Sequence, residues 1–281
     1  MRQLSFAALS PAGFHRVAYT EWGEPDNPRV LVCVHGLTRN GRDFDDLARA
    51  MSGTWRVVCP DVVGRGSSEW LTDKSHYAYP QYCADMAALV ARTGAETVDW
   101  VGTSMGGLIG MMLAAQRGTP IRRMVLNDVG SFIPRASLER IAIYVGSDPR
   151  FGSLAELEAH LRKINASFGP LTDAQWHHLA EHSAVVDADG SVRFRYDPGI
   201  ALPFKAGPLN DVDLTPVWNA VRCPVLIVRG SDSDLLLADT ARKMAASRPG
   251  VELVEFAGVG HAPALMDAAQ VAAVGDFLRT G

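Results

Sequence analysis

Short, continuous runs of apolar residues recur along the chain and predict the strands of a sheet. The runs are rich in valine and do not alternate with polar residues, which is typical of parallel strands covered on both faces. They lie at residues 30–36, 55–61, 98–104, 123–130, 225–230 and 251–256. Segments with helical spacing follow most of them, at residues 42–52, 79–94, 106–118, 238–250 and 268–281. This alternation predicts an α/β fold, a mostly parallel central sheet flanked by helices.

One interval interrupts this alternation. Between Ser131 and about Thr215 no sheet-like run occurs, and three amphipathic helical stretches stand there instead. A polar turn at 187–191 precedes the alternating sequence VRFRYD, which predicts a short hairpin arm. We therefore expect a core made of residues 1–130 and 215–281, and a mostly helical insertion over residues 131–214.

Composition narrows the possible partners. With 281 residues, 47% of them hydrophobic, the chain can bury a large core. Its formal net charge of -4 gives no electrostatic reason to expect nucleic acid or an anionic membrane as a partner. No apolar stretch approaches the roughly 20 residues of a membrane helix, and the first 20 residues lack the apolar core of a signal peptide.

The four cysteines are far apart in sequence and form no CxxC pair. They are Cys33, Cys59, Cys83 and Cys223. Buried free thiols are the favoured interpretation, and they suit a reducing compartment, so a cytoplasmic protein is expected. No structural metal site is expected from them.

The glycines around Ser104 indicate a catalytic turn. Gly102, Ser104 and Gly106 spell G-x-S-x-G between a predicted strand and a predicted helix. In that setting the motif predicts a nucleophile elbow, a turn so tight that side chains at the flanking positions would clash with the strand and the helix. Gly107 and Gly110 would let the helix approach the sheet, although each weakens the helix by up to about 1 kcal/mol. The serine hydroxyl would then lie at a helix N-terminus, where developing negative charge is favoured.

A serine becomes a nucleophile only when a base takes its proton and a third group orients that base. Among the eight histidines, His261 lies in the glycine-flanked loop GVGHAPAL directly after the last predicted strand. That loop leaves the same edge of the sheet as Ser104, so His261 is the expected base. Asp232, Asp234 and Asp128 all lie at the ends of strands on this edge, and position alone does not separate them.

At these residues the chain resembles the α/β-hydrolase fold family, in its branch with a serine nucleophile and a helical cap. The resemblance extends over nearly the full length and rests on six motifs in the order the fold uses. They are VHGLTRN, PDVVGRGSS, GTSMGG, LNDVG, RGSDSDLL and GVGHAPAL. The resemblance is specific for fold and catalytic triad, and much weaker for substrate. It implies that the interval 131–214 is the cap that covers the pocket.

The resemblance implies a role for each position that matches the family's motifs. Ser104 matches the nucleophile and His261 the base. The family's Gly-x-x-Ser-Asp pattern falls on residues 230–234, which makes Asp234 the acid rather than Asp232. Asp128 is the fallback acid, because some relatives place theirs there; otherwise it is a structural carboxylate at the start of the insertion.

The family's histidine–glycine turn falls on His35 and Gly36. The backbone N–H groups of Leu37 and Met105 would then form the oxyanion hole, and His35 would be structural, holding the turn. No cofactor is implied, and no dinucleotide fingerprint follows a predicted strand.

The expected function is hydrolysis of a small carboxylic ester or lactone through an acyl-enzyme intermediate. Related dehalogenases and epoxide hydrolases place an aspartate where this chain has Ser104, which argues against both. The alternatives are a carbon–carbon-bond hydrolase of the same fold and a slow-turnover small-molecule receptor that retains the triad, with lyase or oxygenase chemistry as a more remote one. The sequence does not indicate the oligomeric state.

Three residues are candidates for contact with the substrate. Arg39 would reach the pocket mouth and pair with a substrate carboxylate, or else pair with Asp43 or Asp46 at the surface. Tyr144 and Trp176 would line the pocket from the cap, or else pack within its helices.

Overall fold

The computed structural model describes residues 1–280 and contains an eight-stranded sheet. The strand order is β1-β2-β4-β3-β5-β6-β11-β12. β1 and β2 are antiparallel to each other, β2 is antiparallel to β4, and the other neighbours are parallel. The strands are β1 (Arg2–Ser10), β2 (Gly13–Trp22), β3 (Val30–Val34), β4 (Arg56–Pro60), β5 (Val98–Thr103), β6 (Ile121–Asn127), β11 (Val225–Gly230) and β12 (Val251–Phe256).

All six strands predicted from continuous apolar runs are present, and the predicted mostly parallel sheet is confirmed. The hairpin of β1 and β2 was not predicted, because its apolar and polar residues are mixed rather than gathered in one run. Its outer strand β1 is largely exposed, as expected for the edge of a sheet.

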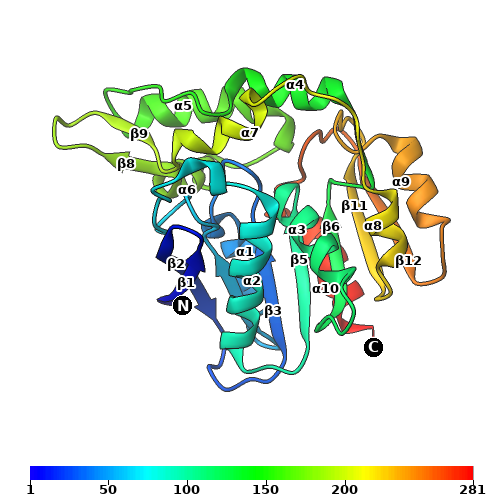
Figure 1. Cartoon of the computed structure of the whole chain (residues 1–281). Helices are drawn as coiled ribbons and strands as arrows, with labels where there is room; N and C mark the ends of the chain where they lie inside the picture. Colours follow the sequence, from blue (N-terminus) through cyan, green and yellow to red (C-terminus); the bar gives the residue numbers. More distant parts are fainter. Residues whose placement is uncertain (281) are drawn as a thin grey trace.

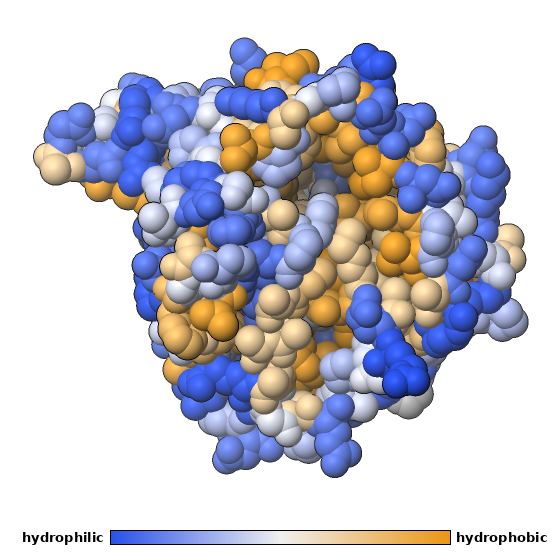
Figure 2. All heavy atoms as spheres, viewed as in Figure 1, coloured by the Kyte–Doolittle hydropathy of each residue, from blue (hydrophilic) through white to orange (hydrophobic). Residues whose placement is uncertain are grey.

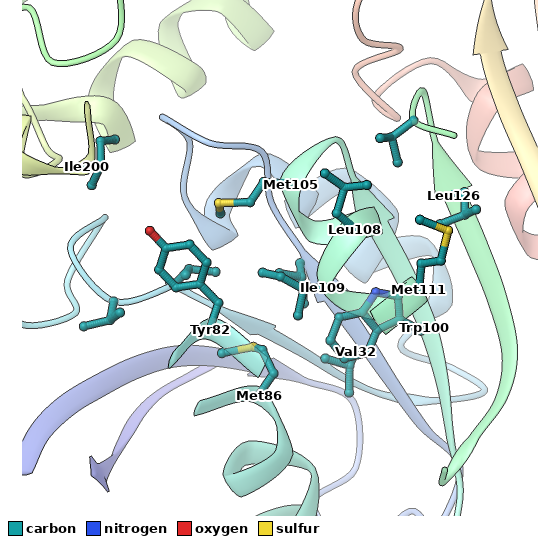
Figure 3. Packing of buried hydrophobic residues seen from close by; sticks show 14 of the residues in the cluster. Val32, Tyr82, Met86, Trp100, Met105, Leu108, Ile109, Met111, Leu126 and Ile200 are labelled. Atoms are coloured by element: carbon teal, nitrogen blue, oxygen red, sulfur yellow. The ribbon is translucent and has the colours of Figure 1, made fainter. Parts of the chain in front are cut away.

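Helices cover both faces of the sheet (Figure 1). One face is covered by α2 (Tyr79–Thr93), α3 (Met105–Ala114), α8 (Thr215–Ala220) and α9 (Ala238–Ala245), whose apolar residues belong to the larger core cluster. The other face is covered by α1 (Asp45–Met51), preceded by the 3-10 turn η1 (Gly41–Phe44), and by α10 (Ala268–Arg279). Trp100, Leu108, Ile109 and Met111 pack at the centre of the larger cluster (Figure 3).

Residues 131–214, called here the cap segment, lie over the carboxyl ends of the parallel strands (Figure 1). They contain α4 (Arg135–Tyr144), α5 (Leu154–Ile164), α6 (Asp173–Ser183) and α7 (Leu202–Lys205), with the 3-10 turns η3 (Ala166–Phe168) and η4 (Pro198–Ala201). The predicted hairpin arm is present as β9 (Val192–Phe194), paired with β8 (Ala184–Val186). Two short strands, β7 (Phe132–Ile133) and β10 (Val212–Asp213), pair near the two ends of the segment and bring its entry and exit together.

Two features bear on the environment of the protein. None of the helices in residues 1–280 combines the length and the apolar character that crossing a membrane requires. All four cysteines are free; Cys33 and Cys59 are buried, whereas Cys83 and Cys223 are only partly covered.

Candidate active site

Ser104 lies in the predicted elbow between β5 and α3. Its backbone angles are φ 50° and ψ −114°, a conformation that a non-glycine residue adopts only under constraint from its surroundings. A Cβ atom on Gly102 would lie 2.3 Å from the carbonyl oxygen of Gly106, and one on Gly106 would lie 2.0 Å from that of Val34. The two glycines of the motif are therefore required by the close approach of strand and helix, as the sequence predicted.

The start of α3 is packed equally tightly onto the sheet. A Cβ on Gly110 would lie 2.2 Å from Nε1 of Trp100, and one on Gly107 would lie 2.5 Å from Cγ1 of Val129. The indole N–H of Trp100 donates to the carbonyl oxygen of Gly106 at 3.1 Å. The helix propensity lost at these glycines is the cost of bringing α3 this close to β5.

The register of the parallel strands gathers the site. Asn127, the last residue of β6, is paired with Thr103 on one side and with Val228 of β11 on the other. Its carbonyl oxygen accepts from the backbone N–H of Ser104 at 2.9 Å, and its side-chain amide donates to the hydroxyl of Thr103 at 3.0 Å. The same amide donates to the carbonyl oxygen of Pro263 at 2.8 Å, in the loop that carries the predicted base.

His261 faces Ser104, as predicted. Its Nε2 lies 3.0 Å from the Ser104 hydroxyl oxygen, and its side chain is 14% exposed. The cap segment holds the loop from the other side. The hydroxyl of Ser167 donates to the carbonyl oxygen of His261 at 3.0 Å, and the backbone N–H of Gly260 donates to the carbonyl oxygen of Ser167 at 2.7 Å.

The carboxylate that contacts His261 is that of Asp128, and not that of Asp234 as the resemblance implied. Nδ1 of His261 lies 2.7 Å from Oδ2 of Asp128, which directly follows β6 and is fully buried. Asp128 also accepts from the backbone N–H of Gly230 at 3.0 Å and from the hydroxyl of Ser233 at 2.5 Å. An Nδ1–H directed at this carboxylate leaves Nε2 free to accept the proton of Ser104.

The loop after β11 explains why the other candidates fail. Its side chains alternate, so that Ser233 points inward to Asp128 while Asp232 and Asp234 are exposed. The carboxylate of Asp234 is 53% exposed and forms an ion pair at 2.5 Å with Arg140 of α4. Asp232 accepts from the hydroxyl of Ser231 instead. The loop thus contributes a serine that holds the acid, and Asp234 joins the core to the cap segment.

The turn after β3 presents the first of the two expected oxyanion donors. A Cβ on Gly36 would lie 3.7 Å from Cβ of Ser104, so this turn lies against the elbow. Within residues 1–280 the N–H groups of Leu37 and Met105 donate no hydrogen bond to the protein itself. Two unpaired donors at a serine with an adjacent base are what an oxyanion hole requires.

His35 holds this turn, as the sequence analysis expected. Its Nε2 accepts from the N–H of Val62 at 2.9 Å, so the proton is on Nδ1, which donates to the carbonyl oxygen of Gly36 at 2.7 Å. Burial is the main reason that its pKa is lowered from 6.5 to about 4, so the ring is neutral near pH 7. In a trans peptide the Gly36 carbonyl and the Leu37 N–H point in opposite directions, so His35 also fixes where Leu37 points.

Arg39 takes the second of its two expected roles. Its Nε and Nη2 donate to the two oxygens of Asp43 at 2.8 and 2.7 Å, but the pair is largely buried rather than at the surface. Arg39 lines a cavity of about 30 Å³ together with Thr103 and Ala262, the neighbours of Ser104 and His261.

The surface is hollowed between cap segment and core (Figure 2). In Figure 2 this face is hollowed beneath α4, over the N-terminal end of α3 where Ser104 lies, and hydrophobic residues border it on one side. Tyr144, at the end of α4, is half-buried against the core, and burial raises the pKa of its hydroxyl. Trp176 is buried in the cap segment, where its ring stacks on Phe168.

Three residues at the site were not predicted from the sequence. Phe168 lines the small cavity, Ser167 contacts the His261 loop, and Ser233 contacts Asp128. No local pattern marks Phe168 and Ser167, which reach the site from the cap segment, whereas Ser233 lies between the two aspartates that the sequence singled out.

One group of side chains has the composition of a metal site. Donor atoms of Asp45, His178 and His182 lie within 4.8 Å of one another where α6 meets α1. The guanidinium of Arg42 donates to both oxygens of Asp45 and lies 3.5 Å from Nδ1 of His182. An internal cation therefore already balances this carboxylate, and the group fits an arginine rather than a metal ion.

Comparison with known proteins agrees with this geometry. Residues 31–274 match the sequence profile of the alpha/beta hydrolase family. A 3-hydroxybutyrate-oligomer hydrolase of Cupriavidus necator is 50% identical over 277 residues, which cover 96% of this chain and 94% of the relative. The structure of an alpha/beta hydrolase from Novosphingobium aromaticivorans has a TM-score of 0.87 and 40% identity over 98% of both chains. That of a Rickettsia typhi protein has a TM-score of 0.94 and 32% identity over 100% of both. These relatives support the expected assignment as a hydrolase of ester bonds.

Proposed function

Because the chain belongs to the alpha/beta hydrolase family, we propose that it hydrolyses short oligomers of 3-hydroxybutyrate or closely related hydroxyacyl esters through an acyl-enzyme intermediate. The observation that carries the chemistry is the continuous contact from the Ser104 hydroxyl through His261 to Asp128. The substrate class rests on the 50% identical relative, whose similarity covers nearly all of both chains.

The first half-reaction forms the acyl-enzyme. The oxygen of Ser104 attacks the ester carbonyl carbon while Nε2 of His261 accepts the hydroxyl proton. The carbonyl oxygen becomes negatively charged and is bound by the N–H groups of Leu37 and Met105. Asp128 stabilises the imidazolium. The tetrahedral adduct then collapses, the bond to the alcohol oxygen breaks, and His261 returns the proton to that leaving oxygen.

The second half-reaction releases the acid. Water gives a proton to His261 and attacks the acyl carbon, and the second tetrahedral adduct expels the oxygen of Ser104, which recovers its proton. Each cycle on an oligomer therefore yields two shorter chains, one with a new hydroxyl end and one with a new carboxyl end.

The test combines one variant with a choice of substrates. Wild-type protein and Ser104→Ala are incubated with the 3-hydroxybutyrate dimer and trimer and with p-nitrophenyl butyrate, and free 3-hydroxybutyrate and nitrophenol are measured. We expect steady turnover by the wild type and loss of nearly all of it in the variant. A fluorophosphonate should label the wild-type protein on the peptide that contains Ser104.

The outcomes separate the parts of the proposal. Equal turnover by Ser104→Ala would refute the serine mechanism. Cleavage of the nitrophenyl ester but not of either oligomer would support the serine mechanism and contradict the proposed substrate class. A burst of one equivalent of product followed by no turnover would indicate the receptor alternative instead.

A further inference from the structure

Arg65 is a fully buried arginine in the loop between β4 and α2, within the GRG sequence that the catalytic chemistry leaves unexplained. Within residues 1–280 it forms no ion pair with an aspartate or glutamate. A guanidinium that is removed from water without a carboxylate partner is costly to the fold. The contacts that the guanidinium makes instead are therefore informative about its role.

Two of the four polar contacts of the Arg65 side chain are with Val63 and Tyr82. Its Nη1 donates to the carbonyl oxygen of Val63 at 2.8 Å and to the hydroxyl of Tyr82 at 3.1 Å. The guanidinium carbon also lies 5.0 and 5.7 Å from the ring centres of Tyr82 and Tyr77. Figure 3 shows the hydroxyl end of Tyr82 directed away from Met86 and toward the cap residue Ile200. Aromatic rings partly replace the missing counter-ion, because their faces attract cations.

The remaining polar contacts lead to the two oxyanion residues. Nε of Arg65 donates to the carbonyl oxygen of Leu37 at 2.9 Å, and Nη2 lies 3.6 Å from the sulfur of Met105. One side chain therefore joins the turn after β3 to the first residue of α3. These are the two segments whose N–H groups must be held at a fixed separation for the oxyanion to be bound by both.

The cap segment fixes the backbone of Arg65 from the outside. The carbonyl oxygen of Gly64 accepts from the N–H of Asp197 at 2.8 Å, and the N–H of Gly66 donates to the carbonyl oxygen of Arg195 at 2.9 Å. Arg65 itself forms an antiparallel bridge with Tyr196. The position of the guanidinium is thus set by a short ladder between core loop and cap segment.

We propose that Arg65 is a positioning residue for the oxyanion hole. It sets the separation of the Leu37 and Met105 segments, and its buried charge favours the negative oxygen that forms between them, because charges interact strongly where water is excluded. This inference rests on the proposed serine mechanism.

The test is a kinetic comparison of Arg65→Met and Arg65→Lys with the wild type. Removal of one oxyanion donor lowers the rate about 10²–10³-fold. In the Arg65 variants both donors remain but are displaced, so kcat for p-nitrophenyl butyrate should fall by about 10- to 100-fold. We expect KM to change by less than about threefold, because ground-state binding does not use the oxyanion. A boronic acid that forms a tetrahedral adduct with Ser104 should bind more weakly by the same factor as kcat falls. Arg65→Lys should recover part of both losses.

Arg56→Met is the matched control. Arg56 also donates to two backbone carbonyls, those of Pro25 and Thr93, but it lies at the start of β4, at the opposite end of the sheet. Arg56→Met should leave both kcat and boronate affinity near wild-type values, even if it changes the melting temperature.

The proposal is wrong if Arg65→Met and Arg65→Lys fold and keep wild-type kcat and boronate affinity. It is equally wrong if kcat falls while boronate affinity does not, since a merely structural role would give that result. Should Arg65→Met fail to fold, the lysine variant decides by the same two measurements. A wild-type protein that neither cleaves esters nor is labelled at Ser104 would instead overturn the proposed function, and the oxyanion role with it.

Discussion

The carboxylate of Asp128 and the imidazole of His261 lie 2.7 Å apart although the two residues are 133 positions apart in the sequence. Asp128 stands directly after β6, with φ 56°, and is held by a backbone N–H and a serine hydroxyl from the loop after β11. The acid is therefore on one strand and its supporting groups on the next. His261 reaches it from the loop after β12, and the three loops meet because the strands are parallel neighbours.

This arrangement predicts opposite outcomes for two matched substitutions. Asp128→Asn should reduce kcat for p-nitrophenyl butyrate about 10⁴-fold, because an amide stabilises neither the required tautomer nor the imidazolium. Asp234→Asn removes an exposed carboxylate that pairs with Arg140 and not with His261, so kcat should stay near the wild-type value. A larger loss in Asp234→Asn than in Asp128→Asn would restore the sequence-based assignment.

We expect that Arg39 does not bind a carboxylate of the substrate. Its charge is balanced by Asp43 through two hydrogen bonds. Arg39→Ala should therefore change KM by a similar factor for the carboxylate-bearing 3-hydroxybutyrate dimer and for neutral p-nitrophenyl butyrate. Asp43→Asn supplies the control, since it frees the guanidinium and should lower KM for the anionic ester alone. A rise in KM confined to the dimer in Arg39→Ala would place a substrate carboxylate on Arg39.

His35 predicts a loss of stability in mild acid. Its pKa is about 4 in the folded protein and 6.5 ordinarily, mainly because it is buried, so between these values the unfolded chain binds a proton that the folded chain does not. His35 should therefore contribute a decrease of roughly 3 kcal/mol to the free energy of unfolding as pH falls from about 6.5 to about 4. Urea unfolding at several pH values measures this change.

The control for that prediction is a second histidine. In His35→Gln the side-chain oxygen can still accept from the N–H of Val62, but nothing titrates, so the pH dependence should become shallower. His177→Gln, at a side chain that is 61% exposed, should keep the wild-type dependence. Identical curves for His35→Gln and the wild type would contradict the assignment of the acid sensitivity to His35.

The elbow predicts a severe effect from a single methyl group. In Gly106→Ala the new carbon would lie 2.0 Å from the carbonyl oxygen of Val34, so strand and helix must separate. We expect a loss of about 3 kcal/mol or more in the free energy of unfolding, at the upper end of overpacking effects. Gly53→Ala has nothing within 4 Å of the added carbon and should be neutral or slightly stabilising. Similar stabilities of the two variants would show that the elbow is not tightly packed.

The sequence by itself determined the sheet strands between Val30 and Phe256, the elbow at Ser104, and His261 as its partner. These inferences depend on local chemistry: continuous apolar runs for strands buried on both faces, glycines where strand and helix nearly touch, and a loop that must leave the same edge of the sheet. The hairpin of β1 and β2 was not predicted, because edge strands do not need continuous apolar runs.

Only the tertiary structure decided which carboxylate serves His261 and which side chains hold the oxyanion turn. Asp128, Asp232 and Asp234 are equivalent by position, and whether a loop side chain points inward depends on how that loop packs against the neighbouring strand. Ser233 takes the inward place, and the carboxylate it faces becomes the acid. The role proposed for Arg65 likewise depends on its contacts with Leu37 and Met105, which are 28 and 40 residues away in the sequence. Contacts between distant residues are fixed by strand register and by the packing of the whole sheet, which no short segment of the chain contains.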